Sequence, residues 1–198
     1  MPVLPTSPTK RVAEQYLATF SSLVRGIDLD RIERIVDRIR AVRDDGRTIY
    51  IAGNGGSAAT AAHWVNDLGK ATKRSGQKPI RVIGLADNAP WLTALGNDEG
   101  FDRVFAGQLE NFAQPDDMLI VISASGRSRN LVKAVELAHE RGLVTIGLLG
   151  FDGGLLKGMV TEVLLIESEV GAYGPVETAH ALVADIITTC LIRDVVSR

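Results

Sequence analysis

Three serines within six residues form the stretch of this 198-residue sequence that most clearly suggests chemistry. They lie in Ser123-Ala-Ser-Gly-Arg-Ser128, between an apolar run that ends at Ile122 and a segment of helical spacing. The first amides of a helix have no intrahelical partner and carry the positive end of its dipole, so hydroxyls beside them suit a dianionic phosphate. The stretch therefore predicts a phosphate site. Capping and turn formation would explain these serines equally well if this loop stood alone.

A second loop of similar character follows an earlier apolar run. In Gly53-Asn-Gly-Gly-Ser57 the glycines let a ligand approach the backbone, and the serine can cap the next helix or contact the ligand. Two such loops in neighbouring strand-loop-helix units favour a ligand site over capping alone. The loop lacks the third glycine of the dinucleotide fingerprint and the lysine of the P-loop, so no nucleotide cofactor is expected. Arg127 and Arg129 could add charge to the phosphate site, but we expect their side chains to point to solvent.

His63 and Asp67 lie four residues apart on the segment after the glycine loop. On a helix they share one face, where an imidazole and a carboxylate could bind a metal ion or a substrate. A histidine and an aspartate at this spacing more often form a simple surface pair, so the spacing alone is a weak signal.

The pattern of apolar residues predicts the elements that position these groups. Helical spacing indicates amphipathic helices over 8–27 and 28–44, and further helices lie near Trp91 and over 128–141. Five short apolar runs predict strands at 48–52, 80–85, 118–122, 143–149 and 163–166. Strands that are apolar throughout and alternate with helices indicate an α/β fold with a doubly wound parallel sheet. Ligands bind such sheets at the carboxyl ends of the strands, where both loops lie.

The last segment, 175–197, predicts a helix of about six turns. Its apolar residues surround much of the circumference: Ala181, Leu182, Val183, Ile186, Ile187 and Leu191. A helix that is apolar on more than one face needs more than one neighbour, so we expect association with copies of this chain. Cover by the two N-terminal helices is the alternative.

Composition indicates a soluble cytoplasmic protein that folds as one domain over residues 1–198. The chain has 45% hydrophobic residues and a mean hydropathy of +0.11, enough to bury a core. Its 22 basic and 24 acidic residues give a net charge of -2, so we expect no direct nucleic-acid partner. Cys190 is the only cysteine, and the sequence shows no signal peptide. No run reaches the roughly 20 apolar residues that cross a bilayer, so we expect no membrane partner.

Four motifs together resemble the bacterial phosphoheptose isomerases. They are Gly53-Asn-Gly-Gly-Ser57, Gly96-Asn-Asp-Glu-Gly-Phe101, Ile122-Ser-Ala-Ser-Gly-Arg-Ser128 and Phe151-Asp-Gly-Gly154, and they cover nearly the whole chain in the family's order. The resemblance implies a flavodoxin-like sugar isomerase (SIS) domain with five parallel strands, two extra N-terminal helices within 1–46 and a core over 47–198. It also implies a homotetramer with sites at subunit interfaces and isomerisation of sedoheptulose 7-phosphate. The implied substrate-binding residues are Asn54, Gly55, Gly56, Ser57, Asp98, Ser123, Ser125, Gly126 and Ser128.

The catalytic positions depart from that family. Its first histidine matches His63, but Asp67 stands where the family has a glutamate that acts as base and zinc ligand. On the last helix Glu177 and Asp185 replace a glutamine and a histidine. The implied metal ligands, for zinc or a harder divalent ion, are thus His63, Asp67, Glu177 and Asp185.

One metal ion would not easily take all four ligands. Glu177 and Asp185 are about 12 Å apart along a continuous helix, unless two chains contribute. His180, one turn from Glu177, is either the missing acid or a core histidine.

Two functions therefore stay open. The first is an altered isomerase with Asp67, Glu177, His180 and Asp185 as its catalytic candidates, which we favour because acidic residues persist at these positions. The second is a phosphosugar-binding protein without catalysis, similar to the replication-initiator-associating proteins, which the stretch from Gly56 to Ala59 also resembles.

Overall fold

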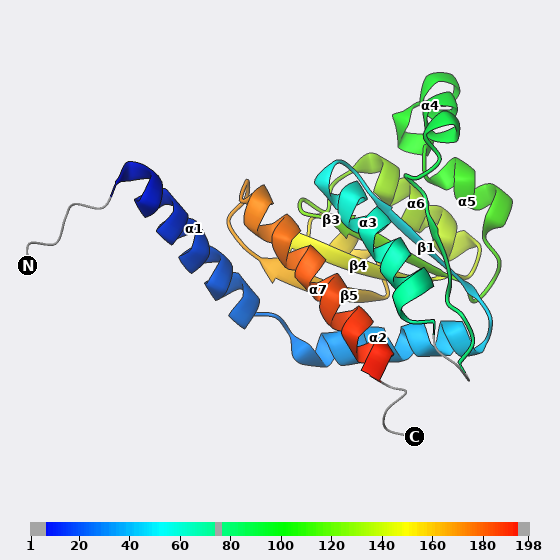
Figure 1. Ribbon diagram of the computed structural model, residues 1–198. Helices are drawn as coiled ribbons and strands as arrows, with labels where there is room; N and C mark the ends of the chain where they lie inside the picture. Colours follow the sequence, from blue (N-terminus) through cyan, green and yellow to red (C-terminus); the bar gives the residue numbers. More distant parts are fainter. Residues whose placement is uncertain (1–6, 74–76, 194–198) are drawn as a thin grey trace, which may run out of the picture.

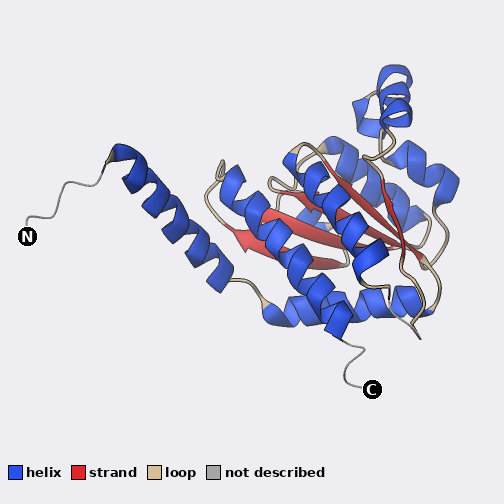
Figure 2. Ribbon diagram, viewed as in Figure 1, coloured by secondary structure: helices blue, strands red, loops and turns tan. Residues whose placement is uncertain are grey.

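The computed structural model describes residues 7–73 and 77–193 of the chain. A five-stranded parallel sheet forms its centre, with the strand order β2-β1-β3-β4-β5 (Figures 1 and 2). The strands are β1 (Thr48–Gly53), β2 (Arg81–Gly84), β3 (Met118–Ser123), β4 (Val144–Phe151) and β5 (Glu162–Glu167). The α-helices are α1 (Pro8–Arg25), α2 (Leu29–Asp44), α3 (Gly56–Asn66), α4 (Ala89–Asp98), α5 (Ala106–Phe112), α6 (Arg129–Glu140) and α7 (Tyr173–Arg193). A π-helical turn, η1 (Asp67–Ala71), continues α3, and η2 (Phe101–Arg103) and η3 (Leu156–Gly158) are 3-10 turns.

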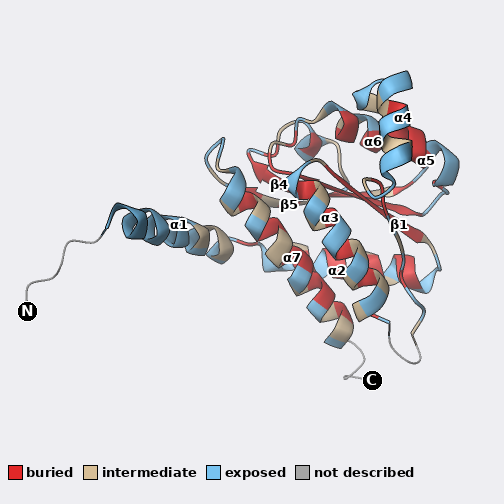
Figure 3. Ribbon diagram, turned by 45° about the horizontal axis from the view of Figure 1, so that its top comes forward, coloured by how far each residue is buried: buried red, intermediate tan, exposed pale blue. Residues whose placement is uncertain are grey.

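The burial of the strands explains their continuous apolar sequences. Every residue of β1 and β3 is buried, as are nearly all of β4, because helices cover both faces of these three strands (Figure 3). At the two edges of the sheet, β2 is mostly exposed or half-buried, and in β5 buried residues alternate with half-buried or exposed ones. The predicted α/β class and five-stranded, doubly wound parallel sheet are confirmed.

Two apolar clusters lie on opposite faces of the sheet. Helices α2, α3 and α7 contribute to one cluster, and α4, α5 and α6 contribute to the other. Figure 1 shows α3 and α7 crossing the near face beside each other, with α2 below them. Helix α5 is an element that the sequence pattern did not predict, because seven residues are too few to establish helical spacing.

Helix α1 packs against this core near its C-terminal end, through Phe20, Leu23 and Val24. It projects from the body of the molecule, and all of its residues are exposed or half-buried (Figures 1 and 3). The side chains of Val12, Tyr16 and Leu17 are 65%, 43% and 62% exposed. The predicted helix is therefore present, but the apolar residues of its N-terminal part are largely uncovered.

Helix α7 is a packed helix of this fold. By length and composition it could cross a membrane, so the expectation that no segment reaches that length is wrong. The polar residues within it are too few to break the apolar run. Its buried apolar side chains nevertheless pack with the cluster that α2 and α3 form on the sheet: Val176, Ala179, Val183, Ala184, Ile187 and Leu191. The helix was predicted to continue to residue 197, and its residues beyond Arg193 lie outside the described part of the chain.

A buried carboxylate fastens β1 to β3 at their amino ends. Asp117 accepts hydrogen bonds from the backbone amides of Thr48 at 2.8 Å and Gln114 at 2.9 Å, and from the hydroxyl of Tyr50 at 3.4 Å. Burial, together with the nearby carboxylate of Asp117, raises the pKa of Tyr50 to about 12. These bonds fix the strands at the end of the sheet opposite the two ligand loops.

Candidate functional site

The strand order creates a crevice between the carboxyl ends of β1 and β3. From β1 the chain passes through α3 to β2 on one side, whereas from β3 it passes through α6 to β4 on the other. Ligands of open parallel sheets bind at such a switch point. The glycine loop and the serine loop identified from the sequence are the two loops that begin here.

Paired asparagine side chains join the two loops. The Nδ2 atom of Asn54 donates to Oδ1 of Asn130 at 3.0 Å, and Nδ2 of Asn130 donates back to Oδ1 of Asn54 at 2.8 Å. Asn130 is buried and also accepts from the amide of Leu131. Sequence reasoning missed Asn130, which lies in the first turn of α6 and whose pairing with Asn54 is non-local.

A cavity of about 170 Å³ lies between the loops. Its lining combines both loops with the start of α7: Asn54, Ser57, Ile122, Ser123, Ala124, Ser125, Ser128, Leu131, Tyr173 and Glu177. The structure thus brings together five of the polar residues that the resemblance implied, and it adds Tyr173, which the sequence did not single out. Five serine and asparagine side chains, the N-terminus of α6 and one carboxylate face a common space.

The serines have different local roles. The hydroxyl of Ser123 accepts from the amide of Gly126 at 3.0 Å, and that of Ser125 accepts from the amide of Arg127 at 3.3 Å, which shapes the loop. Ser128 is the N-cap residue of α6, but its hydroxyl caps no amide among the described residues. Its hydroxyl can therefore donate to an anion beside the positive end of the α6 dipole.

Glu177 lies against the N-terminus of α3. A β-carbon at Gly56 would collide with the carboxylate of Glu177, so the absence of a side chain at Gly56 permits this close approach. Gly55 is the N-cap residue of α3, and no side chain in the described segments caps the helix there. The carboxylate thus faces the positive end of α3, and the opposite side of the cavity faces α6.

The loop after β4 braces the serine loop from behind. The amide of Leu156 donates to the carbonyl of Gly126 at 3.1 Å, and the Arg127 guanidinium forms an exposed ion pair with Asp152. The Gly154 amide and the Arg127 charge hold the pKa of the Asp152 carboxyl below its ordinary value. Arg127 and Arg129 are absent from the described lining of the cavity, and both side chains are largely exposed.

A candidate metal group lies on α3, η1 and α7. His63 Nε2 is 3.0 Å from Asp67 Oδ2, and ligand atoms of His63, Asp67 and Asp185 all lie within 4.8 Å of one another. The indole N–H of Trp64 donates to the Thr188 hydroxyl at 3.2 Å and holds the two helices together. As predicted, His63 and Asp67 lie on the same helical face. His63 belongs to α3, and Asp67 begins the π-helical turn that continues it.

Glu177 is separated from this metal group. The group found among the described residues comprises His63, Asp67 and Asp185, and Glu177 lines the cavity between the loops. A four-ligand site within one chain, as the resemblance implied, therefore does not form in this arrangement. Two turns of α7 separate Glu177 from Asp185, which is the physical reason.

Two other predicted residues lie away from the cavity. His180 is fully buried, and neither ring nitrogen makes a hydrogen bond of ordinary geometry within the described segments. Burial lowers the pKa of its imidazole to about 4, opposed in part by the backbone of Leu149. Asp98 ends α4, where its carboxylate accepts from the side chain of Asn97 at 2.7 Å. Neither residue belongs to the described cavity lining.

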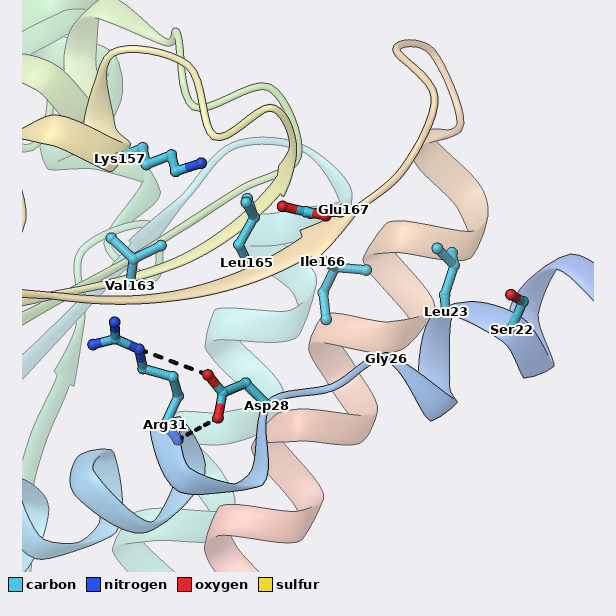
Figure 4. Close-up of a pocket in the computed structure, with 10 residues that line it drawn as sticks. All are labelled: Ser22, Leu23, Gly26, Asp28, Arg31, Lys157, Val163, Leu165, Ile166 and Glu167. Atoms are coloured by element: carbon cyan, nitrogen blue, oxygen red, sulfur yellow. Dashed lines mark hydrogen bonds and ion pairs between the residues drawn. The ribbon is translucent and has the colours of Figure 1, made fainter.

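A second, larger hollow of about 480 Å³ lies between α1, α2 and β5 (Figure 4). Arg31 lines it but already binds Asp28 and Glu162. Apolar side chains of β5, including Val163 and Leu165, make up much of its floor. The hollow lacks the convergent hydroxyls and the helix N-terminus that distinguish the cavity at the switch point.

Comparison with known proteins agrees with the resemblance that the loop motifs indicate. The SIS domain family matches residues 15–150. A probable phosphoheptose isomerase from Thermoplasma volcanium is 37% identical over 179 residues, which cover 90% of this chain and 89% of that relative. The chain belongs to the phosphoheptose isomerase family of SIS-domain proteins. The resemblance predicted from the loop motifs is confirmed.

Other phosphoheptose isomerases are similar to this chain in sequence or in structure. The protein from Geobacter metallireducens is 40% identical over 130 residues, 66% of this chain and 68% of its own length. The solved structure from Neisseria gonorrhoeae has a TM-score of 0.83 and 28% identity, covering 93% of this chain and 98% of that one. These isomerase matches give no support to the replication-initiator-associating alternative. The SIS match ends before α7, which carries Glu177 and Asp185, two of the departures from the family pattern.

Proposed function

We propose that this chain is a phosphosugar isomerase that interconverts a ketose and an aldose phosphate, with sedoheptulose 7-phosphate as its substrate. The observation that carries the proposal is that Ser125 and Ser128 line the same cavity as the carboxylate of Glu177. An anion site and a base in one cavity are what the isomerisation of a phosphorylated sugar requires. The names of the relatives that match most of the chain support a heptose as the sugar.

Glu177 is the proposed base. With the phosphate held at the N-terminus of α6, Glu177 takes a proton from C1 of the ketose to give an enediolate with its negative charge on O2. The proton of the O1 hydroxyl then passes to O2, and Glu177 returns the carbon-bound proton at C2 to give the aldose. The N-terminus of α3, beside Glu177, stabilises the negative charge that develops on the substrate oxygen. Asp67, which the family resemblance points to, is the alternative base.

A divalent cation fits the group of His63, Asp67 and Asp185. One imidazole and two carboxylates within 4.8 Å are ligands that zinc and harder divalent ions accept. When bound, such an ion would polarise a carbonyl oxygen. We propose zinc at these three residues, with Glu177 left to act in the sugar cavity.

We propose further that the protein works in the cytoplasm as a homotetramer with sites at subunit interfaces. The exposed apolar face of α1 supports association, because burying it removes Val12 and Leu17 from water. The side chain of His63 is 68% exposed, which leaves the metal group open to a neighbouring subunit. A shared interface would bring the metal group of one subunit to the sugar cavity of another.

Turnover of sedoheptulose 7-phosphate, with and without zinc, tests the function. The wild-type protein should yield an aldoheptose phosphate, detected by NMR. Glu177→Gln should lower kcat by about a hundredfold or more while thermal shift still reports binding. Ser125→Ala should instead raise KM. Glu169→Gln makes the same chemical change at an exposed position outside the cavity and should leave both constants unchanged.

Two results would contradict this assignment. Tight binding of several ketose phosphates without any turnover would indicate a binding protein. Full activity in Glu177→Gln combined with loss in Asp67→Asn would identify Asp67 as the base.

A further inference from the structure

Tyr173 is the aromatic residue of the cavity lining, and neither the sequence motifs nor the proposed chemistry uses it. It begins α7 four residues before Glu177, so the two side chains share the helix face that lines the cavity. Tyr173 is 52% exposed, whereas the neighbouring Val176 and His180 are fully buried toward the sheet. An aromatic surface is therefore available beside the proposed base.

A strained residue fixes the ring of Tyr173. Phe151 and Tyr173 pack edge-to-face, with ring centroids 5.1 Å apart and planes at 80°. Phe151 is buried and has φ of +52°, a left-handed backbone conformation that is unfavourable for a non-glycine residue. Such strain persists where the surrounding structure requires it, and the strained Phe151 is the residue whose ring packs against Tyr173.

The segment 151–154 ties the two ends of the cavity together. Its first residue holds Tyr173, its second pairs with Arg127, and a β-carbon at Gly154 would collide with the carbonyls of Ser125 and Gly126. The same loop therefore supports both the phosphate-binding end of the cavity and the side that Tyr173 forms. The position of the ring relative to the serine hydroxyls is set by this loop and not by α7 alone.

We infer that Tyr173 is the specificity-determining residue for the carbon chain of the ligand. Its ring packs against the C–H groups of a polyhydroxylated chain whose phosphate is bound at Ser125 and Ser128. The ligand class is thus a sugar phosphate whose chain reaches from the serine loop past Tyr173 toward Glu177. This inference rests on the proposed function, since it concerns the same cavity.

Paired affinities test the inference. Calorimetry on the full chain compares sedoheptulose 7-phosphate with inorganic phosphate. In Tyr173→Ala the sugar phosphate should bind about tenfold more weakly while inorganic phosphate changes by less than about twofold. Tyr173→Phe should keep both affinities. Phe112→Ala is the matched control, because Phe112 is a half-exposed ring that packs edge-to-face with Trp91 outside the cavity.

The outcomes separate the inference from the function on which it rests. A wild-type protein without preference for the sugar phosphate over phosphate contradicts the proposed function and the inference together. A preference that Tyr173→Ala retains overturns the inference alone. An equal loss of affinity for both ligands in Tyr173→Ala also overturns the inference, because Tyr173 would then only support the serine loop. Loss of sugar affinity in Tyr173→Phe equal to that in the alanine variant would rule out packing by the ring.

Discussion

Gly126 is the residue of the serine loop at which a side chain is least tolerable. Its φ is +61°, and a β-carbon there would collide with the carbonyl of Gly153. Gly126→Ala should lower the free energy of unfolding by about 1–3 kcal/mol and weaken binding of inorganic phosphate, because the loop must move. Urea unfolding and calorimetry measure the two effects.

Gly158 provides the control for that substitution. Within the described part of the chain, a β-carbon at Gly158 would meet nothing within 4 Å. Gly158→Ala should therefore change stability by no more than about 0.5 kcal/mol. Equal losses in the two variants would contradict the tight packing of the serine loop against segment 151–154.

His180 makes stability depend on pH. Because its folded pKa is about 4 and the unfolded value is about 6.5, the unfolded chain binds the additional proton between these values. The contribution is complete above pH 6.5 and is lost as pH falls toward 4. It should lower the free energy of unfolding by about 2 kcal/mol between pH 7.5 and pH 5.

Urea unfolding of the wild type and of His180→Gln at pH 7.5 and pH 5 measures the contribution of His180 to the free energy of unfolding. The variant should lose that part of the pH dependence, whatever its stability at pH 7.5. His139→Gln, which changes a histidine that is hydrogen-bonded to Thr145, should keep it. A pH dependence that survives in His180→Gln would show that another group is responsible.

At the level of elements, α3 and α7 must stay in register to keep the metal group together. The indole N–H of fully buried Trp64 donates to Thr188, and His63 and Asp185 lie on the same two helices. Thr188→Val removes the acceptor and leaves a buried donor unpaired, which should cost about 1–3 kcal/mol. Zinc affinity, measured by competition with a chromophoric chelator, should fall as well.

The exposed neighbour Thr189 gives the matched control. Thr189→Val makes the same change on the outer side of α7 and should affect neither stability nor zinc affinity. Zinc affinity that is unchanged in Thr188→Val would mean that the metal group does not depend on this contact.

The elements also show what the sequence can and cannot predict. Strands β1, β3 and β4 were predictable because burial on both faces makes them apolar throughout, and α6 was predictable from its apolar spacing. Helix α5 was too short for such a pattern. The uncovered state of α1 was not predictable, because an amphipathic pattern indicates an apolar face and not what covers it.

In the candidate site, residues that lie close together in the sequence could be predicted, and contacts between distant segments could not. Ser125 and Ser128 lie in one loop at a predicted helix start, so their chemistry was readable from spacing. The pairing of Asn54 with Asn130 and the contact of Glu177 with Gly56 join segments far apart in the chain. Spacing along a single sequence does not reveal such contacts, and for that reason Glu177 was grouped with metal ligands that lie elsewhere.

At the scale of the whole molecule, the face of α1 should govern assembly. Leu17→Asp places a charge on the exposed apolar face and should shift a tetramer toward smaller species in light scattering. Gln15→Asp adds the same charge to an exposed polar residue of α1 and should leave the mass unchanged. A monomeric wild-type protein, or an unchanged mass in Leu17→Asp, would contradict association through this face.

The anchoring of β1 to β3 by Asp117 has a consequence for engineering. The six residues of each strand span about 20 Å, and Asp117 holds one end while ligand chemistry occupies the other. Diversity confined to 53–57, 123–128 and 151–154, with Gly53, Gly126 and Gly154 kept, therefore leaves that anchor intact. Libraries built at the remaining positions of these three loops can seek new phosphorylated substrates while the contacts of Asp117 between β1 and β3 stay unchanged.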